Sequence, residues 1–401
     1  MLEPTAKTSE YPPFKHPTVP SCMSGVCTGV SVAKNPRTAA REIHQAIHQV
    51  DSELTLFFCS PDYDLAELGA EMGHLFGDRN LIGCTTAGEI TPAGYLKSSV
   101  TGVSLPSSAF QVATRRIDGL QRFELAQAEQ CANAVRAELD QRAKDGVTAQ
   151  NSFGFLMIDG LSCREEPVVS ALSQRLGGIQ LFGGSAGDGE SFRATYLYHD
   201  GAFRADCAVF SLVQTHHPFT VFKTQHFIES HQRMVVTEAD PERRVVTEIN
   251  GLPAGREYAR MVGLEVSKLT PMIFATYPVV VRIGGDYYVR SIQKVNDDES
   301  LTFFCAIDEG VVLTVAKGVD LVENLEALFG DVRAAIGQPM LVLGCDCILR
   351  HLEIEQAGIK ETVSRIFQDN RVIGFSTYGE QYNAMHVNQT FAGVAIGVGK
   401  G

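Results

Sequence analysis

Three short segments of the sequence end in the pattern Ser/Thr-x-Gly-Asp/Glu and carry residue types suited to polar binding. Their acids are Glu89, Asp188 and Glu380. The glycine provides a backbone conformation with positive φ or lets another group approach closely, and the carboxylate can accept backbone N–H groups. Each acid therefore has two roles open to it: it binds a polar ligand, or it caps its own loop.

Two cysteines separated by one residue, Cys345 and Cys347, are a second group that could do chemistry. A thiol beside a helix N-terminus has a lowered pKa, which makes this pair a candidate redox site. A zinc site usually needs four ligands, so Cys-x-Cys alone gives little support for a metal. The alternative is that both thiols are buried and pack as small apolar side chains.

The composition limits the class of protein. The chain has 401 residues, of which 44% are hydrophobic and 20% charged, as is typical of a globular protein with two or three domains. Its net charge of −13 disfavours nucleic acids and anionic membrane surfaces as partners. The apolar stretch at residues 391–399 is too short to span a bilayer, so we expect no membrane insertion. The segment before Cys22 has no apolar core, so we expect no signal peptide. Ten cysteines in a chain of this size indicate free thiols and a cytoplasmic location.

Each acidic turn closes a repeated unit of strand, helix and strand. Helical spacing of Leu65, Leu68 and Met72 between two short apolar runs illustrates the pattern in the first unit. A helix between two strands favours parallel pairing through a right-handed crossover. The turns would then lie at the carboxyl edge of a sheet, where ligands of open α/β folds bind. The paired apolar runs are residues 54–59 and 81–84, 153–158 and 179–182, and 340–343 and 372–375.

We therefore expect an α/β fold with α+β features, because β-like segments follow each unit. Residues 1–45 would form an extension and the first helix. Residues 46–215 would form one lobe with two repeats. Residues 216–401 would form a second lobe, in which a largely β stretch over 218–315 precedes the third repeat.

Four segments, in order along the chain, resemble the signatures of the FIST N-terminal and C-terminal domains. They are residues 81–90, 182–189, 248–254 and 372–380. FIST proteins are sensory or ligand-binding modules of signal transduction. The resemblance therefore implies binding rather than catalysis.

Sequence motifs of enzymes give no competing interpretation. The chain has no P-loop, no Gly-x-Gly-x-x-Gly that opens a helix, and no His-Glu-x-x-His. Residues 183–187 match Gly-x-Ser-x-Gly, but the residues after them predict a turn, whereas a nucleophile elbow must open a helix. We expect no enzymatic activity.

Two further segments, residues 223–227 and 385–390, resemble the NosP group of stand-alone FIST proteins. This resemblance implies haem b as cofactor, nitric oxide as ligand, and regulation of a partner histidine kinase or hybrid kinase. Two alternatives stay open. One is a FIST module that binds a small metabolite at the acidic turns without haem, and the other is a thiol redox sensor centred on Cys345 and Cys347.

His226 is the first candidate for the iron ligand that haem would need. Haem requires an apolar slot and an axial ligand. Residues 219–228 are rich in β-formers, and alternation places His226 on one face with Phe222 and Ile228. An ordinary core or edge histidine is an equally good interpretation.

His386, which closely follows the third acidic turn, is the alternative iron ligand. Arg164 and Arg350 are expected near the same edge, where they could pair with the haem propionates. His199 and His351 rank behind these two histidines as candidates.

Overall fold

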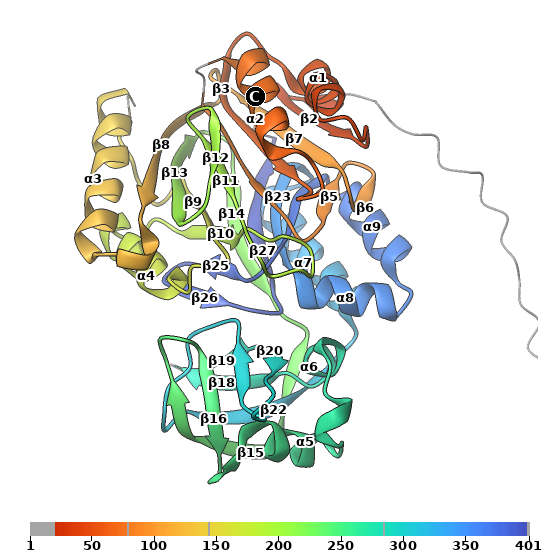
Figure 1. The fold of residues 1–401 in the computed structure, drawn as a ribbon. Coiled ribbons are helices and arrows are strands. Elements are labelled where there is room, and N and C mark those ends of the chain that lie inside the picture. Colours follow the sequence, from red (N-terminus) through yellow and green to blue (C-terminus); the bar gives the residue numbers. More distant parts are fainter. Residues whose placement is uncertain (1–20, 78–79, 143–144, 284, 399–401) are drawn as a thin grey trace, which may run out of the picture.

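The structure is a computed structural model that describes residues 21–77, 80–142, 145–283 and 285–398. Most of the chain forms one body of three sheets, and a smaller β-rich lobe lies below it (Figure 1). This combination confirms the expected mixed α/β class. Residues 1–20 of the expected extension lie outside the described residues.

Three strand–helix–strand units form the body, as the repeats predict. In each unit the two strands pair in parallel. The third unit has two helices where the apolar spacing predicted one. Unit 1 comprises β3 (Ser52–Cys59), α2 (Leu65–Phe76) and β4 (Leu81–Thr85); unit 2 comprises β9 (Ser152–Ile158), α4 (Glu165–Leu176) and β10 (Leu181–Ser185); unit 3 comprises β23 (Pro339–Cys347), α8 (Ile348–Gln356), α9 (Lys360–Asp369) and β24 (Val372–Thr377).

Further strands, mostly antiparallel, extend each unit into a sheet. They are β1 (Ser21–Met23), β2 (Val26–Ser31), β5 (Glu89–Thr91), β6 (Gly94–Leu96), β7 (Val100–Pro106), β8 (Phe110–Asp118), β11 (Leu197–His199), β12 (Ala202–Arg204), β13 (Cys207–Thr215), β14 (Phe219–Thr224), β25 (Glu380–Tyr382), β26 (Met385–Val387) and β27 (Phe391–Gly397). The three strand orders are β1-β2-β7-β3-β4-β11-β12, β26-β25-β10-β9-β13-β8 and β14-β27-β23-β24-β5-β6.

In each unit, a strand that follows the acidic turn pairs with a strand of a neighbouring unit. β5 after turn 1 pairs with β24 of unit 3, β25 after turn 3 pairs with β10 of unit 2, and β11 after turn 2 pairs with β4 of unit 1. This exchange closes a ring, so the three units form one body. The expected division, with the third repeat in a separate lobe, differs from this arrangement because the pairing joins segments that are far apart in sequence.

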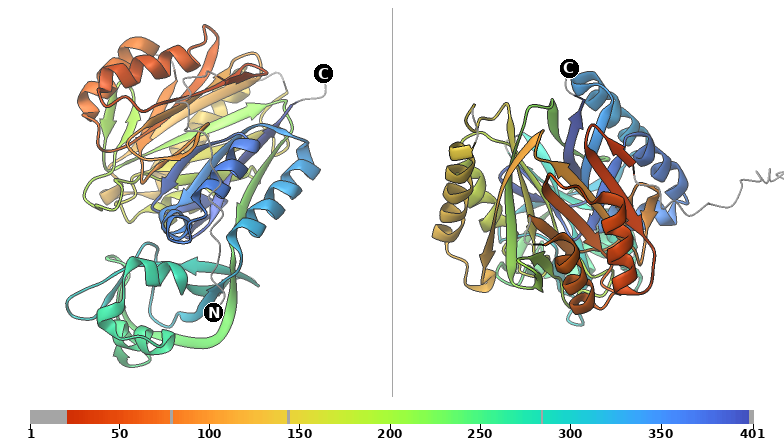
Figure 2. Two further views of the ribbon diagram at one scale, coloured as in Figure 1. Left: turned by 90° about the vertical axis from the view of Figure 1, so that its right-hand side faces the viewer. Right: turned by 90° about the horizontal axis from the view of Figure 1, so that it is seen from above.

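The inner faces of the three sheets share one hydrophobic core. Phe58 of β3 and Phe375 of β24 stack with ring centroids 4.6 Å apart, and Phe182 of β10 belongs to the same buried cluster. The outer faces are covered by α1 (Pro36–Ile47) and α2, by α3 (Leu125–Arg142) and α4, and by α7 (Leu321–Ile336) and α9 (Figure 2). Burial on both faces explains why the central strands are continuous apolar runs.

Residues 227–318 form the β lobe, which has its own core. The chain enters the lobe after His226, whose carbonyl accepts a hydrogen bond from the N–H of Val319, where the chain returns to the body. Its sheet follows the order β19-β18-β22-β15-β16-β21-β20, with β17 paired to β16. The elements are β15 (Phe227–Asp240), β16 (Val245–Ile249), β17 (Leu252–Pro253), α5 (Ala254–Val262), a 3-10 helix (Val266–Lys268), α6 (Pro271–Thr276), β18 (Val279–Ile283), β19 (Asp286–Arg290), β20 (Ile292–Val295), β21 (Leu301–Phe303) and β22 (Val312–Gly318).

One pair of cysteines corrects the expectation of ten free thiols. Cys22 and Cys27 form a disulfide across the β1–β2 hairpin, where they are direct register partners with Cα atoms 4.1 Å apart. This proximity arises from the hairpin, which the cysteine count does not reveal. The other eight cysteines are free.

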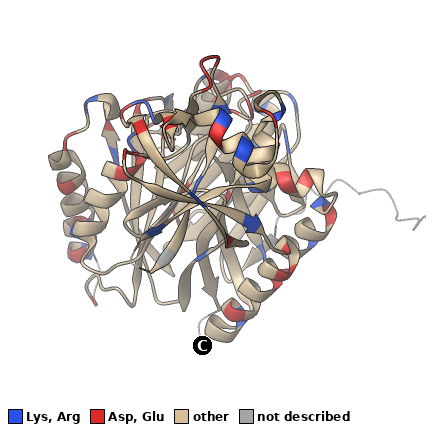
Figure 3. Ribbon diagram, turned by 90° about the horizontal axis from the view of Figure 1, so that it is seen from below, with Lys and Arg blue, Asp and Glu red and all other residues tan. Residues whose placement is uncertain are grey.

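The charged side chains show no segregation by sign. Figure 3 shows Lys and Arg interspersed with Asp and Glu rather than gathered into a basic face. Among the described residues, no helix combines the length and the apolar character needed to cross a membrane.

Candidate functional site

The three acidic turns meet at the carboxyl edge of the body. The N–H of Gly187 in turn 2 donates to the carbonyl of Thr85 beside turn 1 at 3.0 Å. The N–H of Ala87 in turn 1 donates to the carbonyl of Ser376 beside turn 3 at 2.9 Å. The N–H of Ser185 donates to the carbonyl of Gly379 at 2.8 Å. The turns therefore form one hydrogen-bonded ring of backbone.

Glu89 and Glu380 occupy matching positions in turns 1 and 3. Glu89 accepts hydrogen bonds from the hydroxyl of Thr86 at 2.5 Å and from the N–H and hydroxyl of Ser99 at 3.1 and 2.7 Å. Glu380 accepts the equivalent bonds from the hydroxyl of Thr377 and from the N–H and hydroxyl of Thr390.

Burial dominates the acidity of both of these carboxyl groups. It raises the pKa of Glu89 to about 7 and that of Glu380 to about 8, although the hydrogen bonds to their neighbours act in the opposite direction. Both acids hold their own turns together, so the capping role is the one that the geometry supports for them.

Asp188 of turn 2 is bonded differently. Its carboxylate accepts the N–H groups of Phe192, Arg193 and Ala194 at 2.7 to 2.9 Å. It also accepts the hydroxyl of Tyr378 from turn 3. These bonds shape the loop after turn 2 and saturate the carboxylate, so Asp188 also acts as scaffold.

A cavity of about 520 Å³ opens beside turns 1 and 2. Its walls come from the loop after β3, from turn 1, from Lys97 and Ser98, from residues 188–196 after turn 2, and from α8 of unit 3. The cavity therefore lies where all three units meet, at the edge that the repeats predicted. Glu380 does not line it, so two of the three acids border the cavity and the third lies elsewhere.

His351 is the chemically distinctive residue in the cavity wall. Its side chain is only 1% exposed, and neither ring nitrogen makes a hydrogen bond with the described residues. Nε2 lies 3.3 Å from a carboxylate oxygen of Glu355, and the ring packs edge-on against Tyr95. Burial lowers the pKa of His351, which keeps the imidazole neutral. Sequence analysis ranked this residue low because its position relative to the turns depends on α8.

Two cations also border the cavity. Lys97 forms an ion pair with Glu355 at 3.0 Å. Arg193 is exposed, and its guanidinium makes no ion pair or hydrogen bond within the described part of the chain. Arg193 and His351 are therefore the basic groups of the wall whose side chains make no hydrogen bond with the described residues.

His226, the first candidate for an iron ligand, lies elsewhere and is fully engaged. Its Nε2 lies 2.9 Å from Glu353, and its Nδ1 lies 2.7 Å from the guanidinium of Arg350. Arginine only donates, so Nδ1 must accept, and the lone pair that would bind iron is occupied. The expected alternation fails because β14 ends at Thr224, so that His226 belongs to the connection between body and lobe.

The two expected propionate partners do not lie in the cavity. Arg350 is completely buried and binds Asp346 at 2.7 Å as well as His226. Arg164 precedes α4 and contacts the carbonyl of Cys163 at 3.4 Å.

His386, the alternative iron ligand, is buried against turn 3. Its Nδ1 lies 3.2 Å from the amide of Gln381, whereas Nε2 has no partner among the described residues. The ring packs so closely on Gly379 that a Cβ there would lie 2.7 Å from Nε2. His386 therefore lacks space for a haem plane in this conformation.

The Cys345 and Cys347 thiols are both buried. Burial raises the pKa of each thiol well above its ordinary value, and the nearby Glu380 acts in the same direction. Thiol exchange needs the thiolate, so the geometry gives the redox interpretation no support. No cluster of three metal-ligating side chains occurs in the described ranges.

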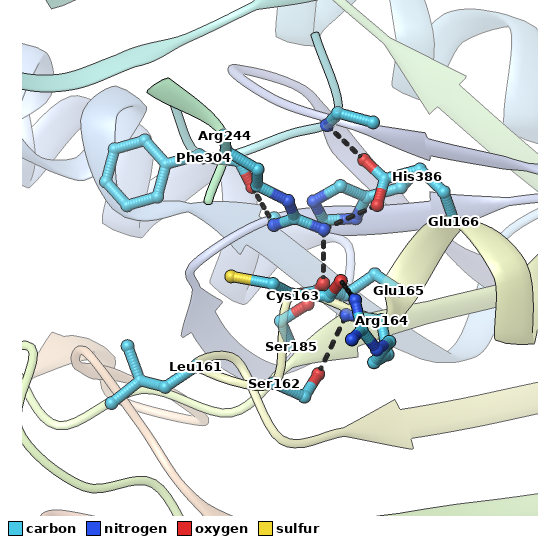
Figure 4. A network of polar contacts seen from close by, with 12 residues as sticks. Leu161, Ser162, Cys163, Arg164, Glu165, Glu166, Ser185, Arg244, Phe304 and His386 are labelled. Atoms are coloured by element: carbon cyan, nitrogen blue, oxygen red, sulfur yellow. Dashed lines mark hydrogen bonds and ion pairs between the residues drawn. The ribbon is translucent and has the colours of Figure 1, made fainter. Parts of the chain in front are cut away.

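Sequence analysis missed Arg244, which connects the β lobe to unit 2. Its guanidinium donates to Glu165 at 2.6 Å and to Glu166 at 2.5 Å, as Figure 4 shows. It also donates to the carbonyl of Phe304 at 2.5 Å, within its own lobe. Arg244 belongs to the pair Arg243-Arg244, and its burial is a tertiary property that local sequence does not carry.

Comparisons with known proteins identify two matching family models. The FIST N domain matches residues 53–252, and the FIST C domain matches residues 254–383. The first match continues beyond the expected boundary at residue 215 and includes β15 and β16 of the β lobe.

One curated relative is the uncharacterized protein MJ1623 of Methanocaldococcus jannaschii, which is 24% identical over 353 residues, covering 79% of this chain and 67% of that protein. Among solved structures, a cyanuric acid hydrolase from A. caulinodans aligns with 93% of this chain and 99% of its own, at 9% identity and a TM-score of 0.35.

Proposed function

The chain belongs to the FIST family, and on this premise we propose that it is a sensory module that binds a small polar ligand in the cavity between its three units. The observation that carries the proposal is the state of His351. A buried imidazole without hydrogen bonds is costly in free energy, and such groups are rare in folded proteins. A ligand in the cavity would complete its hydrogen bonding.

The available groups favour a ligand that carries an anionic group. Four acids border the cavity. The carboxylates of Asp62, Glu89 and Asp188 already accept hydrogen bonds from the protein itself, and Glu190 is exposed to solvent. Arg193 offers a guanidinium, and His351 offers an N–H and an acceptor nitrogen. A carboxylate or phosphate could pair with Arg193, while a neighbouring polar atom bonds to His351.

Helix α8 connects this cavity to the β lobe. Ile348, His351 and Leu352 line the cavity. From the same helix, Arg350 and Glu353 hold His226 at the point where the chain enters the lobe. Binding that shifts α8 would therefore act directly on the connection between the sensory body and the lobe.

The test is a ligand screen with two cavity variants. Purified protein is screened by thermal shift against small carboxylates, phosphates and neutral amides, and hits are titrated by calorimetry. We expect an anionic hit that binds the wild type and the control Arg365→Ala, which changes an exposed arginine on α9. The same hit should bind Arg193→Ala and His351→Leu at least about tenfold more weakly. An anionic hit that binds both cavity variants as well as the wild type would overturn the proposal.

A haem b-based nitric oxide sensor that regulates a partner histidine kinase is the second candidate function. The expected ligands His226 and His386 do not fit haem, for the reasons given above. One observation nevertheless favours this candidate: the ring nitrogens of His351 make no hydrogen bond with the described residues, and the cavity beside them is also bordered by Lys97 and Arg193. These three residues would hold the iron and the propionates.

A spectrum tests this candidate. The protein is reconstituted with haemin, reduced and exposed to nitric oxide. A stoichiometric Soret band that shifts with nitric oxide, and that changes in His351→Ala but not in His226→Ala, would support the haem function. Absence of stoichiometric haem, or a spectrum unaltered in His351→Ala, would reject it. A search for the partner kinase follows only if the protein binds haem and responds to nitric oxide in this test.

A further inference from the structure

A groove of about 590 Å³ lies on the β lobe, separate from the cavity of the body. Its walls come from β15, β18, β19 and β22 and from the segment 306–311. None of its lining residues belongs to the three acidic turns or to α8. The groove therefore has no part in the function proposed above.

The floor and mouth of the groove are apolar. Val281 and Ile307 are buried in the floor, whereas Ile283 and Val312 at the mouth are 45% and 49% exposed. Val235, which is also exposed, is the register partner of Val312 on the adjacent strand, so their side chains share a face of the sheet.

Exposed apolar side chains concentrate on this lobe. Six of the eleven large hydrophobic side chains that are exposed in the described structure lie between residues 227 and 318. Ile283 and Val312 line the groove and Val235 lies beside it, and exposed apolar side chains that gather in this way mark a binding surface.

Arginine side chains border the apolar floor. Arg233 is exposed and makes no ion pair or hydrogen bond within the described ranges. Arg282 lies over the ring of Tyr287, with 5.6 Å between its guanidinium carbon and the ring centroid. Arg290 is half-buried and donates to the carbonyl of His386 at 3.3 Å.

Two acids, Glu229 and Asp308, also line the groove. Glu229 lies near the hydroxyl of Tyr287, whose pKa it raises. Three arginines against two acids leave an excess of positive charge beside an apolar floor. Such a site attracts an anion that also carries an apolar group.

We propose that this groove binds an amphipathic anion, namely a carboxylate on an apolar chain. The chain would lie on Val281, Ile307 and Val312, and the carboxylate would pair with Arg233. The volume lies within the range of small-molecule sites in proteins, which is roughly 300–1,000 Å³. This volume suits a free molecule, and a free carboxylate is therefore the occupant proposed.

The experiment is a calorimetric titration of the full chain with dodecanoate below its micelle-forming concentration. We expect saturable binding of one molecule per chain, with dodecyltrimethylammonium and butyrate as control ligands that bind at least about tenfold more weakly. The Arg233→Glu variant should weaken dodecanoate binding by about tenfold or more. Arg243→Glu, an exposed arginine of the same lobe outside the groove, should leave it within about twofold of the wild type.

Additional variants and ligands distinguish the alternative outcomes. Val312→Ser should also weaken dodecanoate binding, and it changes an exposed side chain that the fold does not require. Binding that is unchanged in both groove variants overturns the proposal, as does equal binding of the cationic amphiphile. Binding to anionic vesicles without binding to free dodecanoate also overturns it. Dodecanoate binding that persists in Arg193→Ala shows that the groove acts independently of the cavity in the body.

Discussion

Two buried histidines lie at opposite faces of α8, and they differ in their hydrogen bonding. On one face, Arg350 and Glu353 hold His226 in a buried network in which both ring nitrogens are bonded. On the other face, His351 is equally buried but has no hydrogen bond among the described residues. The two side chains are both imidazoles, both are almost completely buried, and both involve the same helix. The difference therefore separates a histidine that holds the structure together from one that is available to a ligand.

The comparison also explains why the histidine that the sequence favoured serves as scaffold. A buried polar group contributes most to stability when every partner is present, and it is then unavailable for binding. The acidic turns follow the same rule, since Glu89, Asp188 and Glu380 all bond within the protein. Their repetition marks the framework of the ring, whereas the proposed binding site also depends on α8, which belongs to unit 3 alone.

Removing Arg350 should have the largest effect on stability. Arg350→Met leaves the Asp346 carboxylate buried with the hydroxyl of Tyr95 as its remaining side-chain partner. We expect a loss of about 3–5 kcal/mol in the free energy of unfolding, because an uncompensated charge remains in the interior. Urea denaturation measures the loss. The control Arg365→Met, on an exposed helix face, should stay within about 0.5 kcal/mol of the wild type. A similar small loss for Arg350→Met would refute the idea that this face of α8 is held by its charges.

Glu380 should make the stability of the protein depend on pH. Because its pKa rises from 4.5 to about 8 on folding, the folded state keeps a proton that the unfolded state releases. Stability from this group is present below about pH 4.5 and is lost as the pH rises toward 8. Relative to Glu380→Gln, the wild type should lose roughly 3 kcal/mol between pH 5 and 8, as measured by denaturation at each pH.

The matching residue Glu89 provides the control for this pH dependence. Its pKa is raised only to about 7, so the loss relative to Glu89→Gln should be smaller and should end near pH 7. Equal slopes for the wild type and both variants would show that neither carboxyl group is protonated in the folded protein near neutral pH.

Replacing His226 by leucine should have an intermediate effect. The substitution keeps much of the side-chain volume but removes the imidazole that bonds to the guanidinium of Arg350 and to the carboxylate of Glu353, so that Arg350 keeps only Asp346 as a side-chain partner. We expect a loss of about 1–3 kcal/mol, the usual cost of an unsatisfied buried polar group. Denaturation in urea gives the value. An unchanged free energy of unfolding would mean that water replaces the imidazole without cost. This outcome would weaken the contrast between the two faces of α8.

Much of the framework could be predicted from the sequence. The apolar runs and their helical spacing identified the three parallel strand pairs. The exchange of strands between units could not be predicted in the same way. It pairs Phe375 with Glu89, and nothing in either local pattern specifies a partner so far along the chain.

The cavity lies at the edge of the sheet that the repeats predicted, but its wall does not contain His226 or His386. Alternation within residues 219–228 suggested a strand face for His226, whereas its surroundings come from α8, more than a hundred residues later. His351 gives no local signal, because its isolation results from what surrounds it in three dimensions. Histidines can be found from sequence, but the number of hydrogen bonds that each one makes is a tertiary property.

The substitution of His351 by leucine should have the smallest effect on stability and the sharpest effect on binding. An apolar side chain of similar size removes two ring nitrogens that have no hydrogen-bond partner in the described structure. Replacing an unsatisfied polar group in this way is close to neutral or stabilising, so we expect a change within about 1 kcal/mol of the wild type. Ligand binding should fall at the same time, which is the pattern of a residue kept for function at the expense of stability. The matched variant His226→Leu should show the reverse, with lower stability and retained ligand contacts in the cavity. If His351→Leu instead unfolds as readily as His226→Leu, the imidazole has partners that stabilise the fold, and the two faces of α8 do not differ as proposed.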